Sequence, residues 1–334
     1  MTSFDESIGF VDFIDDFLKS ENINADFKRT GRFRGALRPA HFDAMAAELE
    51  IFQKSCGVKG SVVARADQSA ETGSRLFHGG VVYDMDGGLH PAKFHNGLIA
   101  KARALGVTII ANCPVTKVEK TGSNYTISTP YGTTLARKTA ICTNAYTGAQ
   151  FPELRRRVLP LRSAMIATDV IAPEVMTRLM PKSRVCGDSR RIVAYYRPSP
   201  DGKRILFGGR ATGLKDNPAK NARQLHTAMT QVFPELKTTS ITHVWSGLVA
   251  YTFDHAPHVG QIGGLHYAMG YCGSGVARAT YFGQKMAYKM LGNTDQGRTA
   301  FDDLPFATKP LYKGDPWFMP AVLNWHRLAD RLGL

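Results

Sequence analysis

The stretch Tyr267-Ala268-Met269-Gly270-Tyr271-Cys272-Gly273-Ser274-Gly275-Val276 decides the fold. An apolar run typical of a short strand leads into closely spaced glycines, and the pattern after them predicts a helix from about Val276 to the Gly292-Asn293 stop. Glycines between a strand and a helix let a flat ligand approach the backbone closely. The free N–H groups of a helix start favour negative charge on that ligand. A plain structural turn has the same pattern, so this stretch alone leaves both interpretations open.

Length and composition indicate an ordinary globular protein. The 334 residues are enough for roughly two domains with ample core, and 43% of them are apolar and 21% charged. The start of the chain lacks the features of a signal peptide, and no apolar window approaches the ~20 residues of a membrane span. The five cysteines are scattered without a C-x-x-C pair. That spacing argues against a disulfide framework and a zinc site and favours a reducing cytoplasm.

The strong positive charge raises the question of an anionic partner. The net charge is +14 and the isoelectric point about 9.6, with short basic clusters at 155–157, 190–191 and 203–204. No recognised nucleic-acid-binding module accompanies the charge, so we expect no nucleic-acid partner and no membrane partner. A solvated basic surface that steers an acidic substrate explains the charge. Histidines do not stand at ligand spacing, and no H-E-x-x-H occurs, so no metal is expected.

Hydrophobic periodicity predicts an α/β protein with a β-rich module between two α/β pieces. We expect helices at 10–18, 39–53, 91–105, 173–180 and 217–232. We expect strands at 79–84, 107–111, 115–120, 125–128, 133–136, 140–145, 158–170, 192–196, 205–209 and 241–251. The turn Pro198-Ser199-Pro200-Asp201-Gly202 predicts a hairpin.

A series of motifs precedes and includes the opening stretch. Trp245-Ser246-Gly247 is followed by Thr252-x-Asp254-x-x-Pro257-x-x-Gly260 and then by G-x-x-G-x-G-V at 270–276. In this order the motifs resemble the C-terminal part of the FAD-dependent D-amino-acid oxidase-like superfamily, which includes glycine, sarcosine and γ-glutamylputrescine oxidases. Segments 88–91, 115–118 and 141–146 resemble its helix start, adenine strand and return strand. The wording of 195–198, 207–210 and 250–254 most resembles the γ-glutamylputrescine oxidase-like branch.

The resemblance implies a two-part fold. An FAD-binding Rossmann-like domain (1–26, 87–154 and 251–300) is interleaved with an α+β substrate domain built on an antiparallel sheet (27–86 and 155–250), and 301–334 forms a C-terminal tail. Members of this superfamily resemble Rossmann-type proteins that begin with a strand and G-x-G-x-x-G. No such motif occurs between Met1 and Gly80. The FAD-binding domain is therefore expected to be incomplete, its start either lost or supplied by a second chain.

The implied activity is oxidation of the C–N bond of an amine or amino-acid derivative, γ-glutamylputrescine-like, to an imine by hydride transfer to flavin N5. Val249 stands where relatives carry a carboxylate-clamping arginine or a flavin-bonding cysteine. The resemblance thus implies non-covalent FAD and a small-molecule amine substrate without an α-carboxylate at that clamp. The alternative is a truncated, catalytically inactive remnant that acts as a binding or interaction module.

Candidate site residues follow from the same resemblance. The cofactor-binding candidates are Val115, Thr143, Asn144, Gly260, Gly270, Gly273, Ser274, Gly275 and Val276. The catalytic candidates are His258 and Tyr251, and the substrate-binding candidates are Tyr196, Arg197, Arg210 and Trp245. For the aromatic residues core packing is the competing interpretation, and for the arginines a solvated surface position is.

Overall fold

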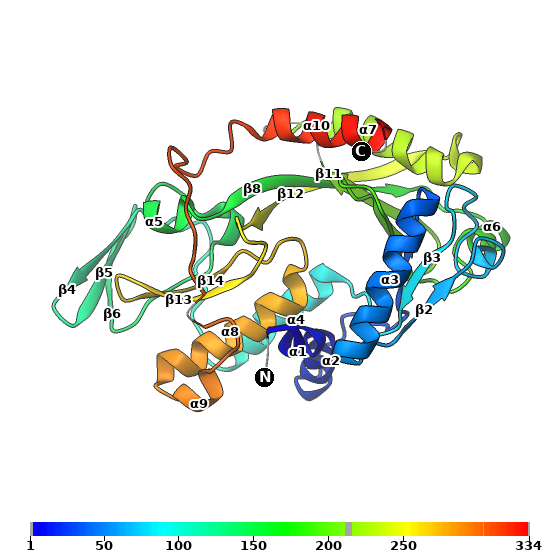
Figure 1. Ribbon diagram of the computed structural model, residues 1–334. Coiled ribbons are helices and arrows are strands. Elements are labelled where there is room, and N and C mark those ends of the chain that lie inside the picture. The colour runs from blue at the N-terminus through cyan, green and yellow to red at the C-terminus, as the bar shows by residue number, and fades with distance from the viewer. Residues whose placement is uncertain (1–2, 211–215, 303, 333–334) are drawn as a thin grey trace. The chain divides into compact units, whose positions relative to one another are not determined.

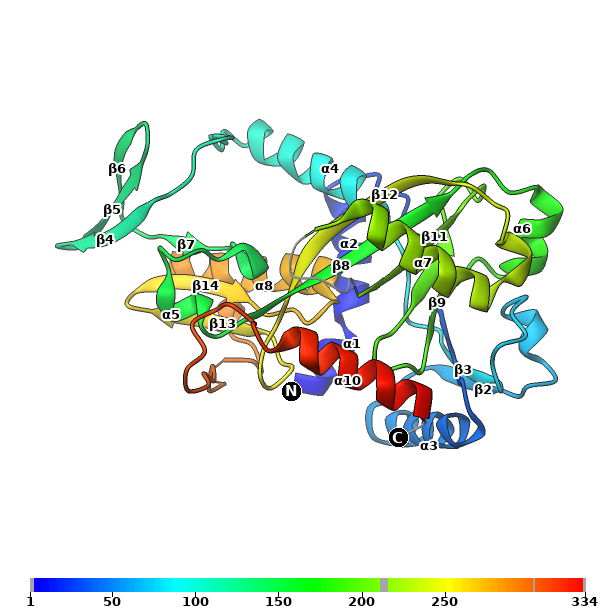
Figure 2. The ribbon, with the colours of Figure 1, turned by 90° about the horizontal axis from the view of Figure 1, so that it is seen from above.

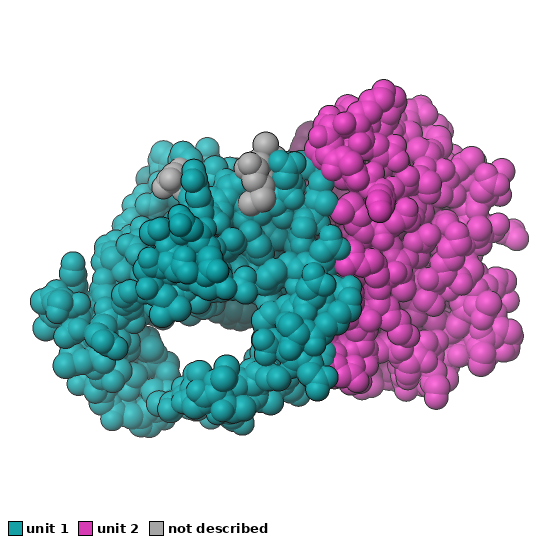
Figure 3. Space-filling model, turned by 90° about the horizontal axis from the view of Figure 1, so that it is seen from below, with its two compact units in different colours: residues 1–23, 94–161, 248–316 teal, residues 24–93, 162–247, 317–334 magenta. Residues whose placement is uncertain are grey.

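The computed structural model describes residues 3–210, 216–302 and 304–332. Two compact units divide the chain. Unit 1 comprises residues 1–23, 94–161 and 248–316, and unit 2 comprises residues 24–93, 162–247 and 317–334 (Figure 3). The chain therefore passes repeatedly between the units. Residues 301–334, expected as one tail, divide between them at Pro316.

Unit 1 is built on a small sheet with strand order β13-β14-β7 (Figure 1). The strands β13 (His258–Ile262) and β14 (Leu265–Met269) are antiparallel, and β14 is parallel to β7 (Ala140–Ile141). The apolar face of α2 (Phe10–Ser20) meets the helix α8 (Gly275–Leu291), because Phe10 and Phe282 share one buried cluster with 5.6 Å between ring centroids. The same cluster holds Val259 and Ala268, so helices and sheet share a core.

Unit 1 also contains a second sheet and further helices. An antiparallel meander comprises β4 (Lys117–Thr121), β5 (Asn124–Thr129) and β6 (Gly132–Ala136). The helices are α1 (Ser3–Ile8), most of α4 (Pro91–Ala104), α5 (Pro152–Arg155) and α9 (Thr294–Gly297), and η2 (Asn144–Tyr146) is a 3₁₀ turn.

Unit 2 carries most of an eight-stranded sheet, in the order β12-β8-β11-β10-β9-β1-β3-β2. The strands are β1 (Arg32–Gly35), β2 (Gly60–Val63), β3 (Gly80–Tyr83), β8 (Leu159–Thr168), β9 (Val185–Asp188), β10 (Tyr195–Pro198), β11 (Ile205–Arg210) and β12 (Ile241–Tyr251). The helices are α3 (Pro39–Cys56), α6 (Pro173–Leu179), α7 (Pro218–Val232) and α10 (Met319–Leu332), with 3₁₀ turns η1 (Gln68–Ala70) and η3 (Pro234–Leu236). The pairing of β1 with β9 is parallel, and those of β8, β11, β10 and β9 are antiparallel.

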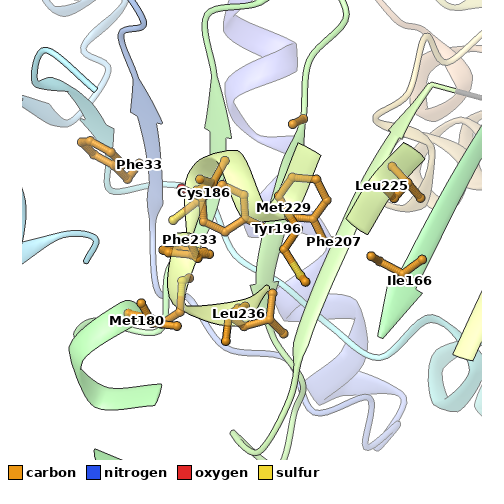
Figure 4. Close-up of a cluster of buried hydrophobic side chains, with 14 of the residues drawn as sticks. Phe33, Ile166, Met180, Cys186, Tyr196, Phe207, Leu225, Met229, Phe233 and Leu236 are labelled. Atoms are coloured by element: carbon orange, nitrogen blue, oxygen red, sulfur yellow. The ribbon is translucent and has the colours of Figure 1, made fainter. Parts of the chain in front are cut away.

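Alternation along the strands gives the sheet of unit 2 two different faces. Ile166, Tyr196 and Phe207 lie in one buried cluster with Met229 of α7, which lies over this side of the sheet (Figures 2 and 4). We call this side the α7 face. Their strand neighbours, such as Met165 and Tyr195, point to the opposite face.

Most predicted elements are present, and the mixed α/β class with an antiparallel-sheet module is confirmed. The prediction of a strand at 107–111 was wrong, because residues 107–110 do not pair with any strand in the described part of the chain. Val107 and Ile110 are 53% and 70% exposed, so the apolar pattern there is not matched by burial. The strand expected at 192–196 begins only at Tyr195. No helix within the described residues is long and apolar enough to cross a membrane.

We predict that Phe207→Ala lowers the free energy of unfolding by about 3–5 kcal/mol, because Phe207 is fully buried and stacks on Tyr196 with 5.6 Å between ring centroids. The neighbouring change Leu206→Ala, on the opposite and partly exposed face, is the matched control and costs about 1 kcal/mol. Urea titration followed by circular dichroism measures both. Equal losses would show that the α7 face is not the principal core of unit 2.

Candidate active site

The carboxyl ends of β7 and β14 meet at one edge of the unit 1 sheet, because these two strands run parallel. The chain leaves β7 through Thr143 and Asn144 and leaves β14 through Gly270. The Gly270 N–H donates to Asn144 Oδ1 over 3.0 Å, and Asn144 has a left-handed φ of 45°. This bond ties the two strand ends together. In open α/β sheets such an edge is where ligands bind.

The backbone conformation of the turn after β14 requires glycine at Gly270 and Gly273. Gly270 and Gly273 have φ values of 82° and 99°, which glycine adopts without a Cβ penalty. A Cβ added at Gly270 would also lie 2.3 Å from Thr252 Cγ2. The N–H of Cys272 donates to Ala250 O over 3.0 Å and fixes the turn against the end of β12. These two glycines therefore serve the turn itself.

Gly275 is different, because the chain around it does not require a glycine. It is the first residue of α8, its φ is not left-handed, and an added Cβ would lie 3.8 Å from the nearest atoms of Tyr271, an ordinary contact. Within the described chain, the N-cap Ser274 makes no side-chain capping bond. The first N–H groups of α8 also have no intrahelical acceptor. Backbone donors and a bare Cα thus lie together at the start of α8, which suits close approach by a planar, electron-rich group.

The remaining cofactor candidates divide into two groups. Thr143 lies at the same edge as Asn144, and its hydroxyl pairs with that of Thr147 at 2.8 Å. Val276 is 41% exposed at the start of α8. Val115 instead packs against the buried cluster around Ile141. Gly260 is on the edge strand β13, where a Cβ would lie 3.1 Å from the Tyr267 hydroxyl, so its glycine has a packing reason.

His258, a catalytic candidate, is buried and has partners. Its side chain is 1% exposed, its ring stacks on Phe306 with 4.1 Å between centroids, and its Nε2 lies 3.0 Å from Asp254 Oδ2. Burial raises the pKa of Asp254, but hydrogen bonds from the Ala256 N–H and from His258 outweigh that effect and hold the pKa below its ordinary value. The pair closes the turn between β12 and β13. Tyr251, the other candidate, is half-buried and meets the ring of His255 edge-on at 5.8 Å.

Two of the substrate candidates lie on strand β10, on opposite faces of the unit 2 sheet. Tyr196 is 1% exposed on the α7 face, where burial raises its pKa well above the usual value (Figure 4). Arg197 points the other way and donates to Leu89 O over 2.6 Å. Burial lowers the pKa of its guanidinium. Of the two, Arg197 has the position that allows contact with a ligand.

The two other substrate candidates are further apart along the chain. Arg210, at the end of β11, lines a cavity of about 570 Å³ together with Arg190, Leu225 and Asp330. Trp245 on β12 is 44% exposed. The structure therefore does not bring the four substrate candidates into one cluster within unit 2.

The hydroxyl groups of Ser163 and Tyr195 form a pair on the face of the sheet opposite α7. The sequence analysis did not predict either residue as a site residue. Ser163 Oγ donates to Gly209 O over 3.3 Å and also contacts the Tyr195 hydroxyl. Either hydroxyl can be the donor in the contact between them, and both oxygens keep lone pairs that can accept a further hydrogen bond. Gly208 makes room for this ring, since a Cβ there would lie 2.2 Å from Tyr195 Cε2. A tyrosine opposite a glycine in the hairpin was the available signal.

Comparison with known proteins identifies the class. The family model described as FAD dependent oxidoreductase (DAO) matches residues 5–289. The chain belongs to this family, whose cofactor is FAD.

Individual relatives are also oxidoreductases by name. A probable oxidoreductase OrdL of Rhizobium meliloti is 32% identical over 278 residues, 81% of this chain and 63% of the relative. The gamma-glutamylputrescine oxidoreductase of Escherichia coli is 24% identical over 322 residues, 95% of this chain and 74% of the relative. The chain thus spans less than two thirds of the first relative's length and about three quarters of the second's.

Solved structures share the fold. Glycine oxidase from Geobacillus kaustophilus superposes with a TM-score of 0.75 at 16% identity, covering 91% of this chain and 81% of that one. L-proline dehydrogenase from P. horikoshii gives a TM-score of 0.72 at 17% identity, covering 96% and 83%. At these identities the likeness concerns the fold alone. The bare Cα of Gly275 and the donors of α8 fit one end of a flavin cofactor.

We predict that Gly275→Ala weakens FAD binding at least about tenfold while leaving folding intact, because the added methyl group meets only ordinary contacts within the chain. The matched control is Gly283→Ala in the same helix, where a Cβ meets nothing within 4 Å. That change removes a helix-interior glycine and should stabilise by roughly 0.5–1 kcal/mol without altering FAD affinity. Titration of each protein with FAD, followed by flavin fluorescence, measures the affinity. Wild-type affinity in Gly275→Ala would contradict the role of this glycine.

Proposed function

We propose that this chain forms the flavin-ring and substrate-binding parts of an FAD-dependent oxidoreductase that oxidises the C–N bond of an amine or amino-acid derivative to an imine. The observation that carries the proposal is the start of α8, where Gly275 has no intrachain need to be glycine. Membership of the FAD dependent oxidoreductase family supports it. The name of the Escherichia coli relative supports a γ-glutamylputrescine-like substrate.

FAD, when bound, supplies the hydride acceptor for such a reaction at flavin N5. The residues of this chain have a simpler task. The N–H groups at the start of α8 provide fixed positive partial charge where negative charge develops, and they need no reorganisation during the reaction. Asn144 accepts a hydrogen bond from the Gly270 N–H and so fixes the position of the turn that leads into α8. Val249 has no nucleophilic atom, in keeping with non-covalent FAD.

Substrate recognition in this proposal uses the face of unit 2 opposite α7. The hydroxyl oxygens of Tyr195 and Ser163 can accept hydrogen bonds, so the pair suits a ligand that brings an N–H donor, such as an amine or ammonium group. Arg197 uses one guanidinium N–H for Leu89 O and has further donors suited to a carboxylate at the far end of the substrate. An acceptor for the amine and a cation for a remote carboxylate match a γ-glutamyl conjugate of a diamine.

The pyrophosphate end of FAD requires a strand–G-x-G-x-x-G–helix unit. We propose that this unit comes from outside these 334 residues, and a second chain is one source. Among the described strands β14 is the named neighbour of β7, which leaves the other edge of β7 open to a further strand. Val107, Ile110 and Leu135 of unit 1 are 53%, 70% and 68% exposed and offer apolar surface for the same partner.

The rival function is a binding or interaction module without catalysis. The deciding experiment adds γ-glutamylputrescine anaerobically to the purified chain reconstituted with FAD, with putrescine and glutamate as comparison ligands. Loss of the oxidised flavin absorbance with γ-glutamylputrescine supports the oxidoreductase. Bound flavin that none of these compounds reduces would refute the proposed substrate. A chain that retains no flavin even when a strand–G-x-G-x-x-G–helix unit is supplied with it would favour the interaction module.

We predict that Tyr195→Phe raises the dissociation constant or KM for the amine substrate about tenfold, because it removes the phenol oxygen from the hydroxyl pair that accepts the amine N–H. The matched control is Tyr196→Phe, which removes a buried hydroxyl on the other face and should leave substrate affinity unchanged. Steady-state kinetics or calorimetric titration measures both variants. If Tyr196→Phe weakened binding as much as Tyr195→Phe, general loosening of the sheet would explain the effect.

A further inference from the structure

The C-terminal helix α10 has an exposed apolar stripe. Trp317 lies just before the helix, and Ala321, Trp325 and Leu328 follow at spacings that place side chains on one helix face. Trp317, Trp325 and Leu328 are 72%, 56% and 46% exposed, and Ala321 is exposed as well. Two tryptophans and a leucine along one stripe exceed what scattered surface apolar residues explain.

The other side of α10 holds the helix to unit 2, so the stripe has a fixed direction. Met319 and Ala329 are 7% and 1% exposed. The carboxylate of Asp330 accepts the N–H groups of Arg191 and Ile192 at 3.1 and 3.5 Å, and Arg38 donates to the Asp330 carbonyl at 2.8 Å. These contacts hold the inner face of α10, and the tryptophan stripe points outward.

A basic helix, α7, lies on the same side of unit 2 as α10 (Figures 1 and 2). Residues of both helices line the cavity of about 570 Å³. Lys220 and Arg223 of α7 are exposed, as is Arg191 beside the end of α10. The sequence of α7 contains no acidic residue, although Asp216 shortly precedes it. This side of unit 2 thus carries both aromatic and cationic side chains.

We propose that this surface, formed by Trp317, Ala321, Trp325 and Leu328 with Lys220 and Arg223, docks on an anionic lipid bilayer. Tryptophan rings favour the layer between headgroups and acyl chains, and a helix with one apolar face lies in the plane of that layer. The lysine and arginine side chains meet anionic headgroups, which attract basic residues near such a surface. The net charge of +14 favours approach of the whole chain.

The size of the stripe favours a bilayer over a second protein copy. A stable protein–protein interface buries about 800 Å² on each partner and uses roughly 20–30 residues a side. Four apolar side chains on a single helix form a much smaller patch. A bilayer demands no shape complementarity, so a short stripe with flanking charge suffices for weak, reversible attachment. Attachment of this kind needs no spanning helix, so it revises the expectation of no membrane partner, and it does not depend on the proposed function.

The experiment is co-sedimentation of the full chain with vesicles of phosphatidylcholine containing one quarter phosphatidylglycerol, compared with phosphatidylcholine alone. We expect binding to the anionic vesicles that weakens with salt. The double change Trp325→Gln and Leu328→Gln should lower the partition coefficient at least tenfold. The change Ile51→Gln removes another exposed apolar side chain of unit 2, 60% exposed on α3, and should leave binding unchanged.

Fluorescence gives a second readout. The chain has three tryptophans, so Trp245→Phe leaves Trp317 and Trp325 as reporters, and their emission should shift to the blue on anionic vesicles. The same partitioning in wild type and the double variant would overturn the proposal. So would an absence of binding to the anionic vesicles. A self-association that the double variant abolishes would then assign the stripe to a second copy. Retention on DNA without vesicle binding would likewise overturn the proposal.

Discussion

The hydrogen bond from the Gly270 N–H to Asn144 Oδ1 joins two segments 126 residues apart, and the candidate flavin site depends on it. Asn144 adopts a left-handed backbone conformation to present this acceptor, which asparagine tolerates better than most residues. The bond brings the end of β7 to the turn that precedes α8. The parallel pairing of β14 with β7 aligns the two strands, and this bond extends the alignment to the segments that follow them.

The turn separates two kinds of glycine that a motif cannot tell apart. Gly270 and Gly273 satisfy left-handed backbone angles, and Gly270 also clears the methyl group of Thr252. Gly275 meets neither need, so the space over its Cα is the informative part of the motif. A glycine without an intrachain reason is evidence of close approach from outside, whereas the others are evidence of a turn. The same reasoning weakens the case for Gly260 as a flavin contact, because its missing Cβ accommodates the Tyr267 hydroxyl.

In unit 2, strand β10 contributes both a core residue and a candidate ligand-binding residue. Tyr196 and Tyr195 are neighbours in β10, yet the first is sealed in the core beneath α7 and the second presents a hydroxyl on the other face. The period of two along a strand makes this division automatic. It also separates the candidate amine-binding face from the side of the unit on which α7 and α10 lie. An amine-recognising face and a bilayer-docking surface can therefore coexist on one small unit.

The sequence by itself determined the family, the mixed α/β class, most helices and strands, and the glycine turn before α8, because these follow from local periodicity, turn residues and motif order. Only the tertiary structure shows that a Cβ at Gly275 would meet no close contact, that Tyr196 rather than Tyr195 lies in the core, and that His258 is buried against Phe306. It also shows no strand at 107–110, because a strand forms only where another strand pairs with it, and local periodicity does not reveal that partner. Side-chain environment depends on contacts between distant segments, and no local pattern encodes those contacts.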